Sequence, residues 1–183
     1  MEFLTALWMP IIISSIVLFF VSAAAWMASP HHGADFKTLE NQEEFVKYVK
    51  DRNIAPGRYV FPNAGTHKAA HEAEFQDKYK DAPVGLLIHF GKVNMGQNMI
   101  WTFVYFLVVH TLLAYLFWLC LSNGDQSFMH VFRVAGTASV LTFTCSSIPN
   151  DIWFKRPMWT NILDGIVYGL ISGLIFAALW PKA

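Results

Sequence analysis

The chain has 183 residues, of which 55% are hydrophobic and only 14% are charged, with equal numbers of acidic and basic side chains. Soluble domains carry about 25% charged residues, so this composition argues against one large soluble core. A net charge of zero argues against a global attraction to nucleic acid, and no zinc-finger, P-loop or dinucleotide-binding motif occurs.

Four apolar blocks are each long enough to cross a bilayer, which requires about 20 residues. The first, Phe3 to Met27, holds no charge, and its length and lack of a preceding basic residue favour a retained helix over a cleaved signal. The other three are Met99 to Leu121, Phe128 to Ile148 and Trp159 to Trp180. Tryptophans lie near the ends of these blocks, as expected at membrane interfaces: Trp8, Trp26, Trp101, Trp118, Trp159 and Trp180.

The segment between the first two spans predicts a small α+β unit. Helical spacing of apolar residues predicts a helix over Glu43 to Arg52, and a second helix is predicted over Thr66 to Lys80, with Thr66 as its cap. Short aromatic and β-branched runs predict strands at Arg58 to Phe61 and Val84 to Phe90. About 60 residues bury little surface alone, so this unit should rest on the bilayer or on a partner.

The predicted fold is therefore an all-α transmembrane bundle of four helices, with a small α+β extramembrane segment between helices 1 and 2. Residues 1–28 form the first transmembrane helix, residues 29–98 form the extramembrane cap, and residues 99–183 contain helices 2–4.

The loop charges predict the orientation. The short loop from Pro149 to Met158 carries Lys155 and Arg156, whereas the opposite loop, Asn123 to Ser127, has no basic residue. Basic residues of short loops stay in the cytoplasm. Both termini are therefore predicted outside and residues 29–98 inside.

Several segments resemble a group of uncharacterised bacterial four-helix integral membrane proteins, and the resemblance runs over most of the chain. It implies this architecture and a multi-pass location in a bacterial inner membrane, but no activity. The segments are Pro10-Ile-Ile-Ile-Ser-Ser, Pro30-His-His-Gly-Ala-Asp35, Pro56-Gly-Arg-Tyr-Val-Phe-Pro62, Pro83-Val-Gly85, Ile148-Pro-Asn-Asp-Ile-Trp153, Asp164-Gly-Ile-Val-Tyr-Gly169 and Leu179-Trp-Pro181.

A stripe of small residues runs along the fourth span at four-residue spacing: Gly165, Gly169, Gly173 and Ala177. Such stripes let helices approach closely. Packing inside this bundle is the favoured interpretation, an intermolecular contact is the alternative, and Ala135, Ser139 and Thr142 of the third span offer a partner face.

Histidines outside the spans are candidate metal ligands. His67 and His71 are four residues apart on a predicted helix, and His31 and His32 directly follow the first span together with Asp35. Imidazole and carboxylate groups are usual metal ligands. Solvated, capping or headgroup-contacting histidines are the favoured interpretation, metal binding is the alternative, and the sequence requires no cofactor.

Four histidine or charged residues lie within the predicted spans: His110, His130, Arg133 and Asp164. His110, near mid-bilayer, could bind a porphyrin, but no second histidine lies at equal depth, so a hydrogen bond to a neighbouring hydroxyl is favoured, with Tyr105, Thr111, Tyr115 and the third span as sources. Asp164 is expected to form a salt bridge near Lys155 and Arg156 or to interact with a helix N-terminus.

These features favour a non-catalytic role: an accessory or stabilising subunit of a larger bacterial membrane complex, respiratory or photosynthetic, with protein partners and the lipid bilayer around it. A metal- or porphyrin-binding redox membrane component is the first alternative, and a small transporter or membrane enzyme is the second. No catalytic triad or pair of intramembrane carboxylates occurs, and no nucleic-acid partner is expected.

Overall fold

The computed structural model describes residues 2–121 and 126–181. The chain forms two compact units, one made of Met1–Lys37 with Met95–Ala183 and the other of Thr38–Asn94. The first unit thus takes in residues 29–37, which the sequence analysis placed in the extramembrane segment. Most of the loop predicted over Asn123 to Ser127 lies outside the described residues.

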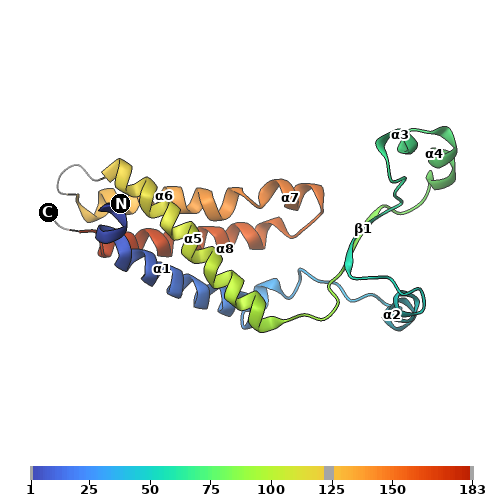
Figure 1. The fold of residues 1–183 in the computed structure, drawn as a ribbon, viewed down its shortest axis with the longest axis horizontal. Coiled ribbons are helices and arrows are strands. Elements are labelled where there is room, and N and C mark those ends of the chain that lie inside the picture. The colour runs from blue at the N-terminus through green and yellow to red at the C-terminus, as the bar shows by residue number, and fades with distance from the viewer. Residues whose placement is uncertain (1, 122–125, 182–183) are drawn as a thin grey trace. The chain divides into compact units, whose positions relative to one another are not determined.

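The first unit is a bundle whose long helices lie side by side (Figure 1). They are α1 (Glu2–Met27), α5 (Met95–Leu121), the series α6 (Phe128–Val140), η2 (Leu141–Cys145) and α7 (Ile148–Trp153), and α8 (Met158–Ala178). Four helices, counting Phe128–Trp153 as one, are long and apolar enough to cross a membrane. The fold is therefore that of a multi-pass membrane protein, as the hydropathy pattern predicted.

The third span contains a wide, π-helical turn at η2, Leu141–Cys145. Pro149 follows four residues after Cys145 and has no N–H to complete a regular helical bond to that carbonyl. Ser146 and Ser147 instead turn their hydroxyls back onto the carbonyls of Thr142 and Thr144, at 3.2 and 3.3 Å. The proline thus accounts for the change of helical pitch next to α7.

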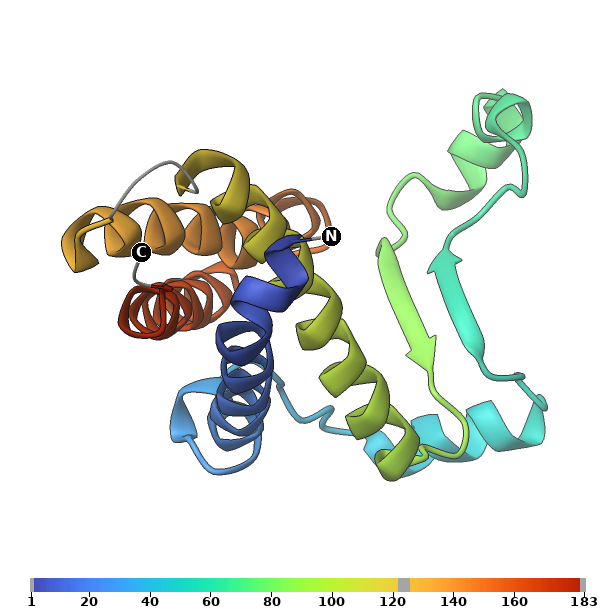
Figure 2. The same cartoon turned by 60° about the vertical axis from the view of Figure 1, so that its left-hand side comes forward.

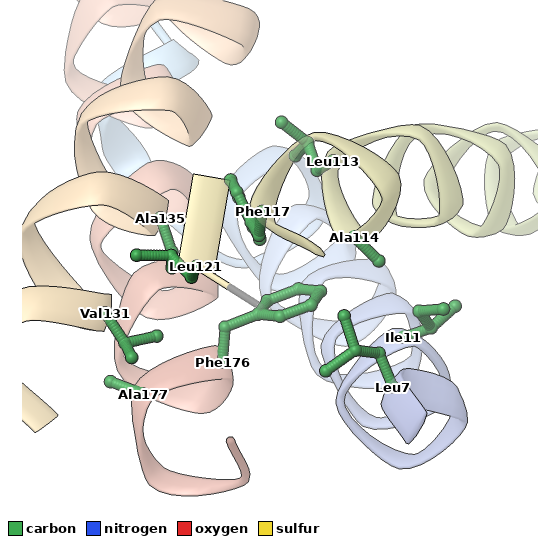
Figure 3. Packing of buried hydrophobic residues seen from close by; sticks show 10 residues of the cluster. All are labelled: Leu7, Ile11, Leu113, Ala114, Phe117, Leu121, Val131, Ala135, Phe176 and Ala177. Carbon is green, nitrogen blue, oxygen red and sulfur yellow. The ribbon is translucent and has the colours of Figure 1, made fainter. Parts of the chain in front are cut away.

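The bundle core consists of layers to which all four spans contribute. Figure 3 shows one layer, in which the ring of Phe176 points between side chains of α1 and those of α5 and α6. A second apolar layer contains Leu18, Phe106 and Tyr168. In each span the contributing positions recur every three or four residues, as expected for one buried face of a helix.

The small-residue stripe of α8 packs within the bundle, against α6 and η2. A Cβ atom added at Gly169 would lie 2.5 Å from the backbone nitrogen of Val140, and one at Gly173 would lie 2.6 Å from Cα of Gly136. A Cβ at Gly165 would likewise meet Thr144. The glycines therefore allow backbone-to-backbone contact, although the residues they meet are Gly136, Val140 and Thr144 rather than Ala135, Ser139 and Thr142.

The second unit is a two-stranded antiparallel sheet with short helices at its ends (Figure 2). Strand β1 (Gly57–Phe61) pairs with β2 (Gly85–His89), so Gly57 lies opposite His89 and Phe61 opposite Gly85. Helix α2 (Gln42–Asp51) precedes β1, and α3 (His67–Ala70) and α4 (Ala73–Tyr79) lie in the connection between the strands. The predicted α+β unit is present.

One predicted element of this unit is wrong in extent. The single helix expected over Thr66 to Lys80 is broken, because Glu72 is extended and separates α3 from α4. Thr66 does cap α3, accepting a hydrogen bond from the amide of Ala69 at 3.2 Å. Neither helix buries any residue, so there is no packing that would hold a longer helix together.

Candidate functional site

A cluster of histidine and aspartate side chains lies where α1 gives way to the short helix η1 (Pro30–His32) and meets α8. His31 and His32 come from η1, and Asp164 comes from the second turn of α8. Pro30 begins η1, and the amide of Gly33 donates to its carbonyl at 2.9 Å. This tight turn places two consecutive imidazoles beside one carboxylate of another helix.

Both imidazoles reach that carboxylate through Nε2. Nε2 of His31 donates to Oδ1 of Asp164 at 2.9 Å, and Nε2 of His32 donates to Oδ2 at 3.0 Å. The hydroxyl of Tyr168, one turn further along α8, donates to the same Oδ2 at 3.1 Å. Asp164 is buried and therefore depends on these donors.

The other nitrogen of each imidazole has a separate partner. Nδ1 of His31 is hydrogen-bonded to the hydroxyl of Ser29, and Nδ1 of His32 is hydrogen-bonded to the carboxylate of Asp35. Thr160 of α8 donates to Asp35 at 3.2 Å. The ring of Trp26 stacks on His32 with centroids 3.9 Å apart, so both imidazole planes and Asp35 are fixed from outside the cluster.

The two carboxylates determine the charge of His32. Burial by itself lowers the pKa of this imidazole, but hydrogen bonds to Asp35 and Asp164, together with their negative charges, outweigh it, so the pKa of His32 is raised. Since a carboxylate only accepts hydrogen bonds, an imidazole between two of them donates from both nitrogens. The metal-free cluster therefore favours a His32 imidazolium between two aspartates.

The same atoms form a set of possible metal ligands. One ligand atom each from His31, His32 and Asp164 lies within 4.8 Å of the other two. An ion bound at about 2.0–2.2 Å holds its ligand atoms roughly 3–3.5 Å apart. Two imidazoles and one carboxylate are a donor set for zinc or iron(II), and such three-ligand sites keep positions open for water or substrate.

The other predicted metal ligands lie in the second unit. His67 begins α3 and His71 follows its last residue, and their ring centroids are 4.9 Å apart. Both imidazoles are exposed, and among the described residues no third metal-binding side chain joins them. The structure therefore brings together His31 and His32 from the predicted set, with Asp164 as their third partner.

The expected partners of Asp164 are wrong. Neither Lys155 nor Arg156 pairs with it, because Arg156 instead lies 3.6 Å from Oδ1 of Asp151. Asp151 also accepts a hydrogen bond from the side-chain amide of Asn161 at 2.9 Å. Arg156 thus lies beside a different buried carboxylate, and the two histidines and Tyr168 donate hydrogen bonds to Asp164.

His110 is fully buried in a polar contact between three spans. Its Nδ1 lies 2.8 Å from the carbonyl oxygen of Phe106 and 3.3 Å from the hydroxyl of Ser15, and its Nε2 lies 3.0 Å from the hydroxyl of Ser172. The hydroxyls come from α1 and α8. The prediction that Tyr105, Thr111, Tyr115 or the third span would supply them is therefore wrong. Both ring nitrogens are engaged, which favours the structural role over porphyrin ligation.

Sequence reasoning did not connect Asp164 with the histidines, nor identify Ser29, Thr160 and Tyr168. The four-residue spacing of Asp164 and Tyr168 indicated a shared helix face, and Asp35 follows His32 closely enough for a local contact. The approach of residues separated by 132 or 133 positions had no such signal.

Comparison with protein-family models, curated proteins and solved structures gives no match for this chain.

Proposed function

We propose that this multi-pass membrane protein binds a divalent transition-metal ion at one end of its bundle, through Nε2 of His31, Nε2 of His32 and the carboxylate of Asp164. One observation carries the proposal: both Nε2 atoms converge on one carboxylate while each Nδ1 is held by a separate partner. Metal-binding histidines characteristically present one nitrogen to the ion and donate from the other to a carboxylate or other acceptor.

Metal binding needs only local proton changes. His32 would lose its Nε2 proton and keep the Nδ1 proton on the Asp35 side, which is the carboxylate–histidine–metal arrangement of many metal sites. His31 would move its proton to Nδ1 and donate to Ser29. Asp164 keeps the Tyr168 hydrogen bond, which orients the carboxylate toward the ion.

Metal analysis of purified full-length protein tests the proposal. After chelation and reloading with Zn²⁺ or Co²⁺, we expect one ion per chain, with Co²⁺ giving an absorption band typical of mixed nitrogen and oxygen ligands. Asp164→Asn or His32→Ala should abolish binding of this ion. Asp35→Asn should weaken binding by about 10–100-fold, because Asp35 only orients a ligand.

The matched control removes the other pair of neighbouring histidines. His67→Ala with His71→Ala should leave the stoichiometry and the cobalt spectrum unchanged, since these residues lie in the second unit. Loss of the ion in this control, or its retention in both Asp164→Asn and His32→Ala, would disprove the assignment.

An accessory or stabilising role in a larger membrane complex is the second candidate. The second unit favours it, because none of its residues 38–94 is buried although many are apolar. The glycine stripe of α8 does not support this role, since its glycines contact α6 and η2 of the same chain. Purification under mild conditions should then yield other subunits in stoichiometric amounts, and a chain that purifies alone would count against this role.

The proposed location is the bacterial inner membrane, with both termini outside and residues 29–98 in the cytoplasm. Lys155 and Arg156 support this orientation. In a background lacking Cys120 and Cys145, Ser127→Cys should react with an impermeant thiol reagent in intact cells and Lys155→Cys should not. The opposite pattern would reverse the orientation.

A further inference from the structure

The second unit has no hydrophobic core of its own. In the bundle, side chains such as Phe117 and Phe176 are fully buried, whereas every residue from 38 to 94 is at least partly exposed. A two-stranded sheet with short helices cannot enclose its apolar side chains. The unit must therefore bury apolar surface against something else.

Exposed apolar side chains lie at both ends of this unit, with Phe61 and Val84 at the end that carries α3 and α4 and a second set at the end that leads into α5. The strand register places Gly57 and His89 at the same end of the sheet, and α2 leads into this end. Leu39 precedes α2, while Phe90 and Val93 follow β2, and all three are exposed. This set, Leu39, Phe90 and Val93, is called the apolar end below.

The surface of α2 at this end is amphipathic. Val46 and Val49 of α2, together with Ile54, line a hollow of about 450 Å³ whose remaining lining is polar: Lys50, Asn53 and His89. His89 is held there by a hydrogen bond between its Nδ1 and the carbonyl oxygen of Ile54, at 2.9 Å. A surface that mixes aliphatic and polar groups in this way suits the boundary between acyl chains and headgroups.

Chain connectivity indicates what covers the apolar end. The unit ends at Asn94 and the membrane-spanning helix α5 begins at the next residue, Met95. Exposed apolar residues continue from Phe90 and Val93 into Met95, Ile100 and Trp101 of α5. The apolar end is thus joined along the chain to the exposed apolar surface of a helix that is long and apolar enough to cross a membrane.

We propose that the apolar end of the second unit inserts into the interface of the phospholipid bilayer that holds the bundle. Acidic and basic side chains are equally frequent in residues 38–94, so the contact is hydrophobic and needs no anionic lipid. The opposite end of the sheet, with Phe61 and Gly85, carries α3 and α4 and stays in water.

Fluorescence quenching in vesicles tests this assignment. Full-length protein lacking Cys120 and Cys145 receives one cysteine, labelled with a polarity-sensitive fluorophore, and is placed in phosphatidylcholine vesicles. Phe90→Cys and Val93→Cys should be quenched by lipids brominated on the acyl chains, like a label at Ile100, and protected from iodide. Adding phosphatidylglycerol should change neither result.

Val84→Cys is the matched control. Val84 precedes β2 as Phe90 follows it, both are largely exposed, and they are six residues or about 20 Å apart along the strand. Its label should be quenched by iodide and not by brominated lipid.

Three results would overturn the proposal. Iodide quenching at positions 90 and 93 would place the apolar end in water. Protection from both quenchers would place a protein surface there. Equal lipid quenching at positions 84 and 90 would exclude insertion by one end.

Discussion

The two units of this protein differ in how far they bury aromatic side chains. Phe117 of the bundle is 0% exposed, whereas Phe90 of the second unit is 74% exposed. The bundle even buries polar groups completely, including Ser15, His110 and Ser172, because helices on several sides supply their partners. Long helices that cross a bilayer can enclose a core on all sides, and elements of ten residues or fewer, as in the second unit, cannot.

The difference also explains where chemistry is concentrated. In the bundle, Asp164 is held by two imidazoles and a phenol, and His32 lies between two carboxylates. In the second unit, the neighbouring pair His67 and His71 stays exposed. Packing around a side chain holds its donor atoms in a fixed geometry, and among the described residues the group of possible metal ligands lies in the bundle.

The largest expected effect comes from adding a side chain where the glycines of α8 contact the backbone of α6. Gly169→Leu should cost about 4 kcal/mol or more of bundle stability, because the side chain would meet the backbone of Val140, which cannot move aside. Unfolding by denaturant in detergent measures this cost. Gly136→Ala is the control, since its Cβ would meet only Phe132 at 3.8 Å. If Gly169→Leu were as stable as wild type, Gly169 and the backbone of Val140 would not be in close contact.

The same substitution in each unit tests the comparison directly. Phe117→Ala should destabilise the bundle by about 3 kcal/mol, because it leaves a cavity among the buried side chains of α1, α5 and α8. Phe90→Ala should change the unfolding free energy by no more than about 0.5 kcal/mol. Similar losses for the two variants would mean that the units do not differ in packing as described.

A smaller effect is expected at the buried histidine of α5. His110→Gln should cost about 1 kcal/mol, because the amide keeps a hydrogen bond to one of Ser15 or Ser172 and loses the other. Thermal unfolding with absorption spectroscopy of the purified protein provides the measurement. A haem or chlorophyll band in wild type that His110→Gln lacks would instead assign His110 to a porphyrin.

The smallest effect is expected from pH on the metal-free protein. The folded-state pKa of His32 is raised above its ordinary value of 6.5, so its contribution to stability is fully present below about pH 6.5. That contribution should be lost as pH rises through the raised pKa. Thermal unfolding in chelator across this range should show the decline, and His32→Gln should remove it while His71→Gln does not. A stability that rises with pH in wild type alone would contradict the imidazolium assignment.

The sequence alone determined the four long apolar helices, the two strands and the capping role of Thr66. These follow from local patterns: runs of about 20 apolar residues, short β-branched segments, and a threonine before a helical turn. It also identified the glycine stripe and the histidines next to the first span as unusual. Its error in secondary structure was the extent of one helix, which breaks at Glu72 because neither half buries a residue.

Only the tertiary structure decided which of these residues meet. Asp164 bonds to His31 and His32 rather than to Arg156, and His110 bonds to Ser15 and Ser172 rather than to hydroxyls of its own helix or the third span. Both outcomes depend on how far each helix is rotated and shifted against its neighbours. Rotation and shift are fixed by close backbone contacts such as Gly169 with Val140, and these act between residues remote in the chain, where no local pattern records them.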